Sequence, residues 1–306
     1  FYLLLHKKEQ IASLASGTTF ESINKATIET FPVSLPPHHE QRAIAHTLRA
    51  VQSAQVARRL ELALERERKA ALMEHLFTHG MRMERRKQTE IGEVPESWEI
   101  VKLGRVARIE RGKFAHRPSN DPAFYGGQTP FIQTGDVATA AGRDGRIRTF
   151  SQTLNETGLA VSKVFPKRTI VITIAANIGY TGILQFDSAF PDSLIGISPF
   201  AGIDTEYLNH YLSTQQAEMD RMAPRGTQKN INIEFLAPWP VKVPPLEQQG
   251  EIVAVLSACD AKIGALEREA GLLDELFRAM LEELMTGRLS ALPLVEDFHE
   301  RPATKG

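Results

Sequence analysis

Residues 226–249 read GTQKNINIEFLAPWPVKVPPLEQQ, and residues 17–41 read GTTFESINKATIETFPVSLPPHHEQ. From Ile23 onward, a shift of 208 positions superposes the two stretches, so that Ile23-Asn24 falls on Ile231-Asn232 and Pro36-Pro37 falls on Pro244-Pro245. The same shift continues without a gap and matches Gln41 with Gln249, Ile44 with Ile252, Leu48 with Leu256, Leu76 with Leu284 and Thr78 with Thr286. A repeat of this length is a duplicated domain-plus-helix module, because a solenoid unit has a period of a few tens of residues.

The first copy of the module begins close to the start of the chain. With one residue of slippage, Tyr2-Leu3 aligns with Tyr211-Leu212, which lies near the end of the second globular segment. The sequence opens with Phe1 and not with an initiator Met. We therefore expect the chain to be a fragment of a longer protein, in which the first module is cut.

Each repeated stretch is followed by a segment that predicts one long helix. Glu40 to about Thr78 contains neither Gly nor Pro and is rich in Ala, Leu, Glu and Arg, which favour helices. Glu247 to about Thr286 carries a fuller apolar stripe at steps of three and four residues, the pattern of a helix that buries one face. A Pro-Pro pair precedes each segment, and Gly80 and Gly287 follow them, as expected at helix ends.

The segment between the two helices, Trp98–Val243, has a mixed pattern. Short β-branched runs such as Ile170–Ile174 alternate with Gly, Asn and Asp turns, which predicts strands and hairpins. Thr205–Met222 predicts a helix, with its apolar residues on one face. The fold class that we predict is therefore α+β, with globular domains joined by long helices.

The two predicted helices carry opposite charge. Glu40–Gln88 has 11 Lys and Arg against 6 Asp and Glu, whereas Glu247–Arg301 has 5 against 12. Two solvated faces would explain this, but the helices are also homologous. We therefore favour two helices that lie alongside each other, with charge selecting the partner.

Composition limits the class of protein. A chain of 306 residues with 42% hydrophobic residues can form one large or two ordinary domains with a buried core. The single cysteine, Cys259, excludes an intramolecular disulfide framework and suits a reducing compartment, which predicts a cytoplasmic protein. No apolar run approaches the 18 or more residues that a membrane-spanning helix needs.

No pattern for a catalytic centre, a cofactor site or a metal site stands out. His75 and His79 have helical spacing, but they lack the Glu of a zinc-protease motif and a third ligand nearby, so a solvated helix face is the better interpretation. Asn177–Gly182 resembles a phosphate loop only faintly, because the Lys-Ser/Thr ending is missing, and a hairpin turn fits better. We expect no catalytic residues, cofactor or metal in this chain.

Positive charge is clustered within the central segment, although Glu90–Pro245 has 16 Lys and Arg against 16 Asp and Glu. Arg and Lys neutralise phosphates, Arg reads guanine edges, and Asn or Gln reads adenine edges. The candidate DNA contacts are Arg111, Lys113, Arg117, Arg143, Arg146, Arg148, Arg225, Gln228, Lys229 and Asn230. The alternative is an ordinary charged surface. Asn24 and Asn232 occur in both modules and fit backbone contacts at a turn better than base reading.

The order of several loose motifs resembles a known family. Residues 92–98 read GEVPESW, residues 130–136 read PFIQTGD, residues 226–232 read GTQKNIN, and residues 240–248 read PVKVPPLEQ ahead of a long helix. This module closely resembles the specificity subunits of type I restriction-modification systems, and the resemblance covers nearly the whole chain. Those proteins contain two target-recognition domains, each followed by a long helix.

The resemblance implies both the domain organisation and the mechanism. Residues 1–37 would be the end of a first recognition domain, 38–80 the first spacer helix, 81–96 a linker, 97–245 the second recognition domain, 246–288 the second spacer helix and 289–306 a tail. Each recognition domain would read one half of a split double-stranded DNA site, and the helices, packed antiparallel, would set the spacing.

The resemblance also implies the partners. Methyltransferase subunits would supply the S-adenosylmethionine chemistry, and an ATP-dependent translocating endonuclease subunit would join for restriction. This chain would then be non-catalytic, without a membrane partner. The alternative function is a helix-paired scaffold that binds protein and not DNA, against which the Arg clusters argue.

Overall fold

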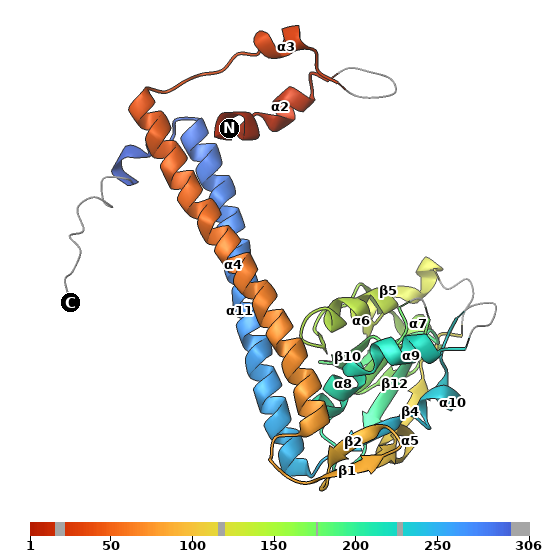
Figure 1. The fold of residues 1–306 in the computed structure, drawn as a ribbon. Helices are drawn as coiled ribbons and strands as arrows, with labels where there is room; N and C mark the ends of the chain where they lie inside the picture. Colours follow the sequence, from red (N-terminus) through yellow and green to blue (C-terminus); the bar gives the residue numbers. More distant parts are fainter. Residues whose placement is uncertain (16–21, 116–119, 176, 225–228, 295–306) are drawn as a thin grey trace. The chain divides into compact units, whose positions relative to one another are not determined.

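Two long helices organise the chain (Figure 1). In this computed structural model, which describes residues 1–15, 22–115, 120–175, 177–224 and 229–294, α4 spans His38–His79 and α11 spans Leu246–Met285. Both expected long helices are present. Gly80 and Gly287 follow them with φ of +72°, a conformation that glycine adopts without strain.

The chain divides into two compact units, each containing one part of both helices. Unit 1 comprises residues 1–66 and 262–306, and unit 2 comprises residues 67–261. Within the part of the chain that the structure describes, no helix is long and apolar enough to cross a membrane.

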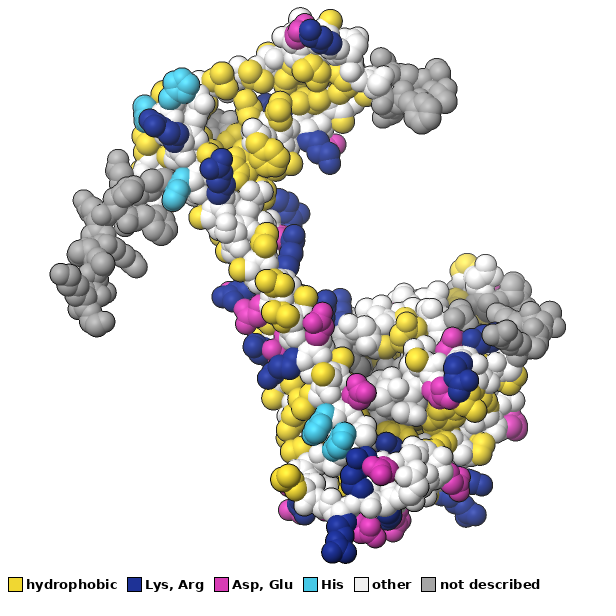
Figure 2. Space-filling view, in the orientation of Figure 1, with side chains coloured by type: hydrophobic (Ala, Val, Ile, Leu, Met, Phe, Trp, Pro, Cys, Tyr) yellow, Lys and Arg dark blue, Asp and Glu magenta, His cyan; other side chains and the backbone are white. Residues whose placement is uncertain are grey.

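Opposite charges pair along the two helices, which confirms the sequence prediction. In unit 1, Arg59 contacts Asp274 at 2.8 Å and Arg66 contacts Glu267 at 2.6 Å. In unit 2, Lys69 contacts Asp260 at 2.5 Å. Because the residue number falls on α11 as it rises on α4, the helices run antiparallel. Figure 2 shows Lys or Arg and Asp or Glu side chains interspersed along the pair.

Each unit contains an apolar cluster built from equivalent residues of the two repeats. The cluster of unit 1 contains Ile44 and Leu48 from the start of α4, Leu284 from the end of α11, and Tyr2. The cluster of unit 2 contains the equivalent residues, listed in the same order: Ile252, Leu256, Leu76 and Tyr211. The duplication in sequence is therefore a duplication in packing.

Repeated polar residues also make repeated hydrogen bonds. The Oδ1 atoms of Asn24 and Asn232 accept from the backbone N–H groups three residues later, at 2.8 and 2.9 Å, and so cap two short helices. Gln41 donates to the Pro36 carbonyl at 2.7 Å, and Gln249 donates to the Pro244 carbonyl at 3.0 Å. The backbone role expected of both asparagines is confirmed.

Unit 2 contains all of the named strands. A five-stranded sheet has the order β4-β12-β9-β10-β6, a four-stranded sheet has the order β7-β5-β11-β8, β13 pairs with β3, and β1 pairs with β2. The strands are β1 Arg86–Thr89, β2 Gly92–Pro95, β3 Glu99–Lys102, β4 Ala107–Arg111, β5 Tyr125–Phe131, β6 Arg146–Ile147, β7 Gln152–Leu154, β8 Val164–Phe165, β9 Ile170–Thr173, β10 Thr181–Leu184, β11 Ser188–Ala189, β12 Leu194–Pro199 and β13 Pro240–Val243.

Short helices complete both units. Besides α4 and α11, the helices are α1 Tyr2–His6, α2 Lys8–Ala12, α3 Lys25–Glu29, α5 Leu103–Val106, the 3-10 helix η1 Pro122–Phe124, α6 Thr134–Ala141, α7 Glu156–Ala160, α8 Thr205–Thr214, α9 Gln216–Met222 and α10 Ile233–Leu236. The α+β class is confirmed.

The five-stranded sheet is buried on both faces. In β9, Ile170 and Ile172 belong to the cluster that includes α8 and the helix pair, whereas Val171 belongs to a second cluster on the other face. Successive strand residues point to opposite faces, so an uninterrupted apolar strand indicates a sheet covered on both sides.

The structure differs from the sequence expectations in two places. Residues 81–96, expected to be a linker, contain the hairpin β1-β2, whose polar strands resemble a linker in composition. The helix expected over Thr205–Met222 is divided into α8 and α9 at Gln215. The Gly179 segment is a turn of the β9-β10 hairpin, as expected.

Candidate nucleic-acid interface

The candidate DNA contacts do not form one patch. Arg111 ends β4, at one edge of the five-stranded sheet, and Arg146 begins β6, at the other edge. Four strand spacings separate these edges, roughly 19 Å. Asn230 forms an isolated antiparallel bridge with Ala175, beyond the end of β9. Arg117, Arg225 and Gln228 lie outside the described residues.

Arg146 and Arg148 belong to an ion-pair network. Arg146 contacts Glu206 of α8 at 2.6 Å and Asp144 at 3.6 Å, and Arg148 contacts Asp144 at 2.6 Å. Burial alone would raise the pKa of Asp144, but hydrogen bonds from Arg148 and Arg146 hold that pKa below its usual value. Both arginines are therefore engaged with carboxylates, and their contact with DNA stays a prediction.

The same network includes a buried histidine and the helix pair. His210 of α8 is 6% exposed, and burial, together with the charges of Lys69 and Arg146, lowers its pKa to about 3. Burial also raises the pKa of Asp260, against the opposing effect of Lys69. The turn that carries Arg146 is thus linked electrostatically to α4 and α11.

Three other candidates differ in their surroundings. Lys229 pairs with Asp220 of α9 at 2.9 Å. Lys113 and Arg143 are exposed, and within the described ranges neither has an ion pair. The charges of Lys113 and Arg143 are therefore available to a phosphate without breaking an existing ion pair.

A glycine allows a close approach beside Arg111. Any Cβ at Gly112 would lie 2.2 Å from the Pro191 carbonyl oxygen and 2.6 Å from that of Phe190. The turn between β11 and β12 consequently lies directly against the end of β4, where Arg111 donates from Nε to the Asp192 carbonyl at 2.6 Å. This contact fixes the Arg111 guanidinium through one nitrogen.

A polar cleft of about 560 Å³ lies next to this turn. Its lining combines aromatic rings with amide and hydroxyl groups: Phe114, Asn120, Tyr125, Phe131, Gln133, Ser151, Gln152, Pro191, Asp192 and Ser193. Sequence reasoning missed these polar residues as a group, because they come from four separate segments. In the sequence, the one indication of this cleft is the motif at residues 130–136, which contains Gln133.

Two glutamines of the cleft form an amide pair. Gln133 follows β5 and Gln152 begins β7, and Gln133 Nε2 donates to Gln152 Oε1 at 2.9 Å. Asp136 holds this corner, since its Oδ2 accepts from the Gln133 backbone N–H at 2.8 Å and from Ser151 Oγ at 3.1 Å. These bonds fix the loop after β5 next to the start of β7.

The turn before β9 is a basic feature that the sequence analysis overlooked. Arg168 has φ of +70°, and among the described residues it is the only non-glycine with positive φ. Its backbone N–H donates to the Leu184 carbonyl at 2.8 Å, and Lys167 N–H donates to Asp187 at 2.8 Å. This turn presents Lys167 and Arg168 as exposed cations.

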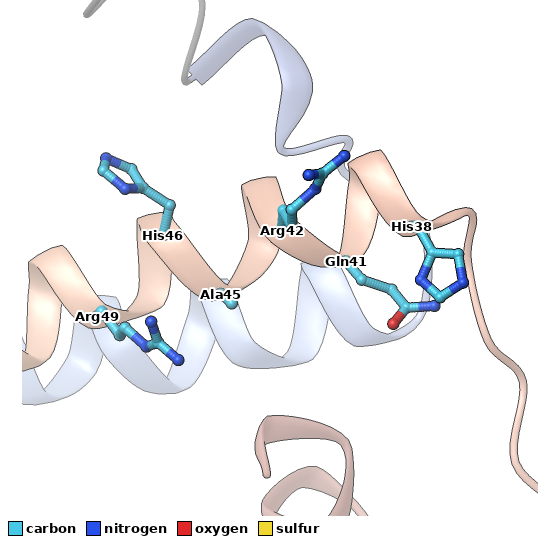
Figure 3. Close-up of a pocket in the computed structure, with 6 residues that line it drawn as sticks. All are labelled: His38, Gln41, Arg42, Ala45, His46 and Arg49. Atoms are coloured by element: carbon cyan, nitrogen blue, oxygen red, sulfur yellow. The ribbon is translucent and has the colours of Figure 1, made fainter.

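Unit 1 has a basic surface at the start of α4 (Figure 3). His38, Arg42, His46 and Arg49 are exposed on one side of the helix. Their side chains spread apart, so this is an open surface and not an enclosed pocket. The equivalent positions of α11 are Leu246, Gly250, Ala254 and Ser257. The equivalent part of α11 is helical although it has no basic residue at these positions, so the basic residues of α4 are not needed to form the helix.

Comparison with protein families gives one match over most of the chain. The model of the type I restriction modification DNA specificity domain matches residues 1–66 and 95–276. These ranges include the amide pair, the cleft and both long helices over most of their length.

Curated relatives and solved structures agree with that match. The chain is 27% identical to a putative type I restriction enzyme MjaX specificity subunit of Methanocaldococcus jannaschii, covering 94% of this chain and 67% of the relative. It is 25% identical to the MjaVIII specificity subunit of the same organism, covering 94% and 69%.

The fold is similar to that of an HsdS subunit from Thermoanaerobacter tengcongensis, with a TM-score of 0.54, 22% identity and coverage of 94% and 70% of the two chains. It is also similar to a chain from a structural study of type I R-M complex assembly, with a TM-score of 0.61, 23% identity and the same coverage.

Proposed function

Because the chain belongs to the family of type I restriction modification DNA specificity domains, we propose that it is the DNA-recognition subunit of a type I restriction-modification complex. Residues 97–245 read one half of a bipartite site in double-stranded DNA. The match of the family model across this segment carries the proposal. The cleft supports it, because amide and hydroxyl side chains line it and Arg111 lies beside it, bonded to the Asp192 carbonyl.

The helix pair sets the distance between the two half-sites in this proposal. Each helix is about 60 Å long at 1.5 Å per residue. The equivalent apolar clusters of the two units support this role, since each recognition domain is attached to the helices by the same set of repeated residues.

Catalysis belongs to other subunits in this proposal. Methyltransferase subunits carry S-adenosylmethionine and modify the site, and an ATP-dependent endonuclease subunit joins for restriction. An apolar row on α4 supports a docking role for the helix pair. Val56, Leu60 and Leu64 follow one another at four-residue steps, and they are 67%, 60% and 56% exposed. We assign this row to the methyltransferase subunit.

The proposal is tested by exchanging the recognition domain. Residues 98–243 are replaced by the equivalent domain of another specificity subunit, and the chain is expressed with its methyltransferase subunit. Sequencing of methylated positions in cellular DNA is expected to show that one half of the split motif changes while the other half and the spacing stay the same.

An unchanged methylated motif would sink the proposal and favour a scaffold that binds only protein. Salt dependence gives a second readout. DNA affinity is expected to fall steeply between 50 and 200 mM salt, by about 10³-fold or more if six phosphates are neutralised. Binding that is indifferent to salt would mean that the basic residues do not contact phosphates.

A further inference from the structure

The Gln133–Gln152 pair has unused hydrogen-bonding capacity. The bond between the two amides uses one N–H and one carbonyl oxygen. The Gln133 Oε1 atom also accepts from the Asp136 backbone N–H in a capping box, which leaves one lone pair of that oxygen. The Gln152 NH₂ group has no further partner among the described residues. The capping box fixes the orientation of the Gln133 amide, because only its oxygen can accept from the Asp136 N–H. The pair therefore presents one acceptor, Gln133 Oε1, beside one donor, the Gln152 NH₂ group.

This pattern matches one base in the major groove. Adenine offers the N6 amino donor and the N7 acceptor there, whereas guanine offers two acceptors, O6 and N7. An acceptor beside a donor satisfies both groups of adenine. Facing guanine, the acceptor oxygen of the pair would oppose another acceptor. The amide pair thus distinguishes the two purines.

The surroundings hold the pair in position before DNA binds. Gln152 lies opposite Phe131 in the β5-β7 ladder, and Phe131 is only 1% exposed. Gln133 is fixed from the other side by Asp136, which accepts its backbone N–H. Side chains held in this way lose little freedom on binding, which favours selective contacts.

Cations lie beside the same cleft. Arg111 is anchored through Nε to the Asp192 carbonyl, and Asp192 lines the cleft. Lys113 is exposed two residues further along. Contacts to phosphates fix the register of a protein on DNA, and base contacts then carry the sequence information. Arg111 and Lys113 supply the phosphate contacts, and they lie next to the amide pair, which is suited to base contacts.

We propose that the Gln133–Gln152 amide pair reads an adenine in the half-site recognised by residues 97–245. This inference rests on the proposed function and names a base and two residues for it. Asp136 is a positioning residue, because it holds Gln133 and Ser151 without facing the base.

The test uses the full chain together with its methyltransferase subunit. Gln133→Leu and Gln152→Leu remove the amide and leave an apolar side chain that is one atom shorter. Gln88→Leu is the matched control, because Gln88 is an exposed glutamine of the polar hairpin β1-β2. Binding selection from a library with a randomised half-site, and sequencing of methylated cellular DNA, give the base preference at every position.

We expect each cleft variant to lose preference for adenine at one position by about tenfold, while the other positions and the affinity for random DNA remain unchanged. The control keeps the wild-type motif. A second variant, Gln133→Glu, tests the chemistry directly. A carboxylate accepts from the cytosine amino group, so the preference at the same position is expected to move toward cytosine.

Three results contradict the proposal. An unchanged motif in Gln133→Leu, Gln152→Leu and Gln133→Glu overturns the assignment of the base reader and leaves the proposed function intact. A lost preference for a base other than adenine also overturns it. If the wild-type chain selects no sequence at all, the proposed function fails as well. Thermal unfolding of each variant identifies a folding defect. If a leucine variant is unfolded, the base preference of Gln133→Glu decides whether the pair reads adenine.

Discussion

At the scale of single residues, the polar network around His210 shows how charge is buried in unit 2. Burial and the charges of Lys69 and Arg146 lower the pKa of His210, and the charge of Asp144 opposes them. A protonated imidazole would add a positive charge among two existing cations, away from water. The folded protein therefore contains a neutral His210, whereas an unfolded chain protonates histidine near its ordinary pKa of about 6.5.

The depressed pKa of His210 predicts acid sensitivity. Its folded pKa of about 3 lies below the unfolded value, so the unfolded state binds more protons between these two values. Stability contributed by neutral His210 is complete above pH 6.5 and falls with decreasing pH, by up to about 1.4 kcal/mol per unit. Thermal unfolding of wild type and His210→Gln between pH 4 and pH 8 measures the difference. Parallel pH profiles for the two proteins would refute this assignment.

At the scale of elements, the helix pair combines two kinds of ion pair. Arg66–Glu267 is partly open to solvent, with side chains 54% and 33% exposed. Lys69–Asp260 is enclosed, with side chains 14% and 6% exposed. Exposed pairs contribute little because water and salt screen them, but removal of one partner from an enclosed pair leaves a charge without compensation.

Two substitutions one turn apart on α4 should therefore differ in effect. Lys69→Met is expected to lower the free energy of unfolding by about 3 kcal/mol, and Arg66→Ala by less than about 1 kcal/mol. Urea denaturation measures both. Addition of Asp260→Leu to Lys69→Met is expected to restore much of the loss, because the unpaired carboxylate disappears. Equal effects of the two single substitutions would show that burial does not control the strength of these pairs.

At the scale of the whole molecule, the helix pair has a paired side and an open side. Residues such as Leu48, at 0% exposure, pack within the clusters, whereas Val56, Leu60 and Leu64 are exposed to solvent. A helix row of this kind is normally polar in a protein that works alone. The row fits the proposed methyltransferase subunit, which would bury it.

Substitution on this row should separate assembly from DNA reading. Leu60→Gln combined with Leu64→Gln retains good helix formers and removes the apolar row. We expect reduced co-purification with the methyltransferase subunit and an unchanged half-site preference of the free chain. Leu159→Gln, at an exposed leucine of α7, is the control. Normal assembly of the double variant would exclude this row as the docking surface.

Much of the architecture follows from the sequence. The shift of 208 residues located both helices, and the opposite charges of the helices identified them as partners. These inferences succeed because helix periodicity and charge are local properties of a segment. The roles of Asn24 and Asn232 followed in the same way, since a helix cap depends on residues only three positions apart.

The candidate interface depended on contacts between distant segments. The arginines from Arg143 to Arg148 resemble a DNA-binding cluster in sequence, yet folding places Arg146 and Arg148 against Asp144 and Glu206. Gln133 and Gln152 are unremarkable in sequence and become an amide pair because β5 and β7 are adjacent. The sequence by itself determined the repeat, the helices and their pairing. Only the tertiary structure decided which polar groups remain available, because that depends on neighbours supplied by other strands.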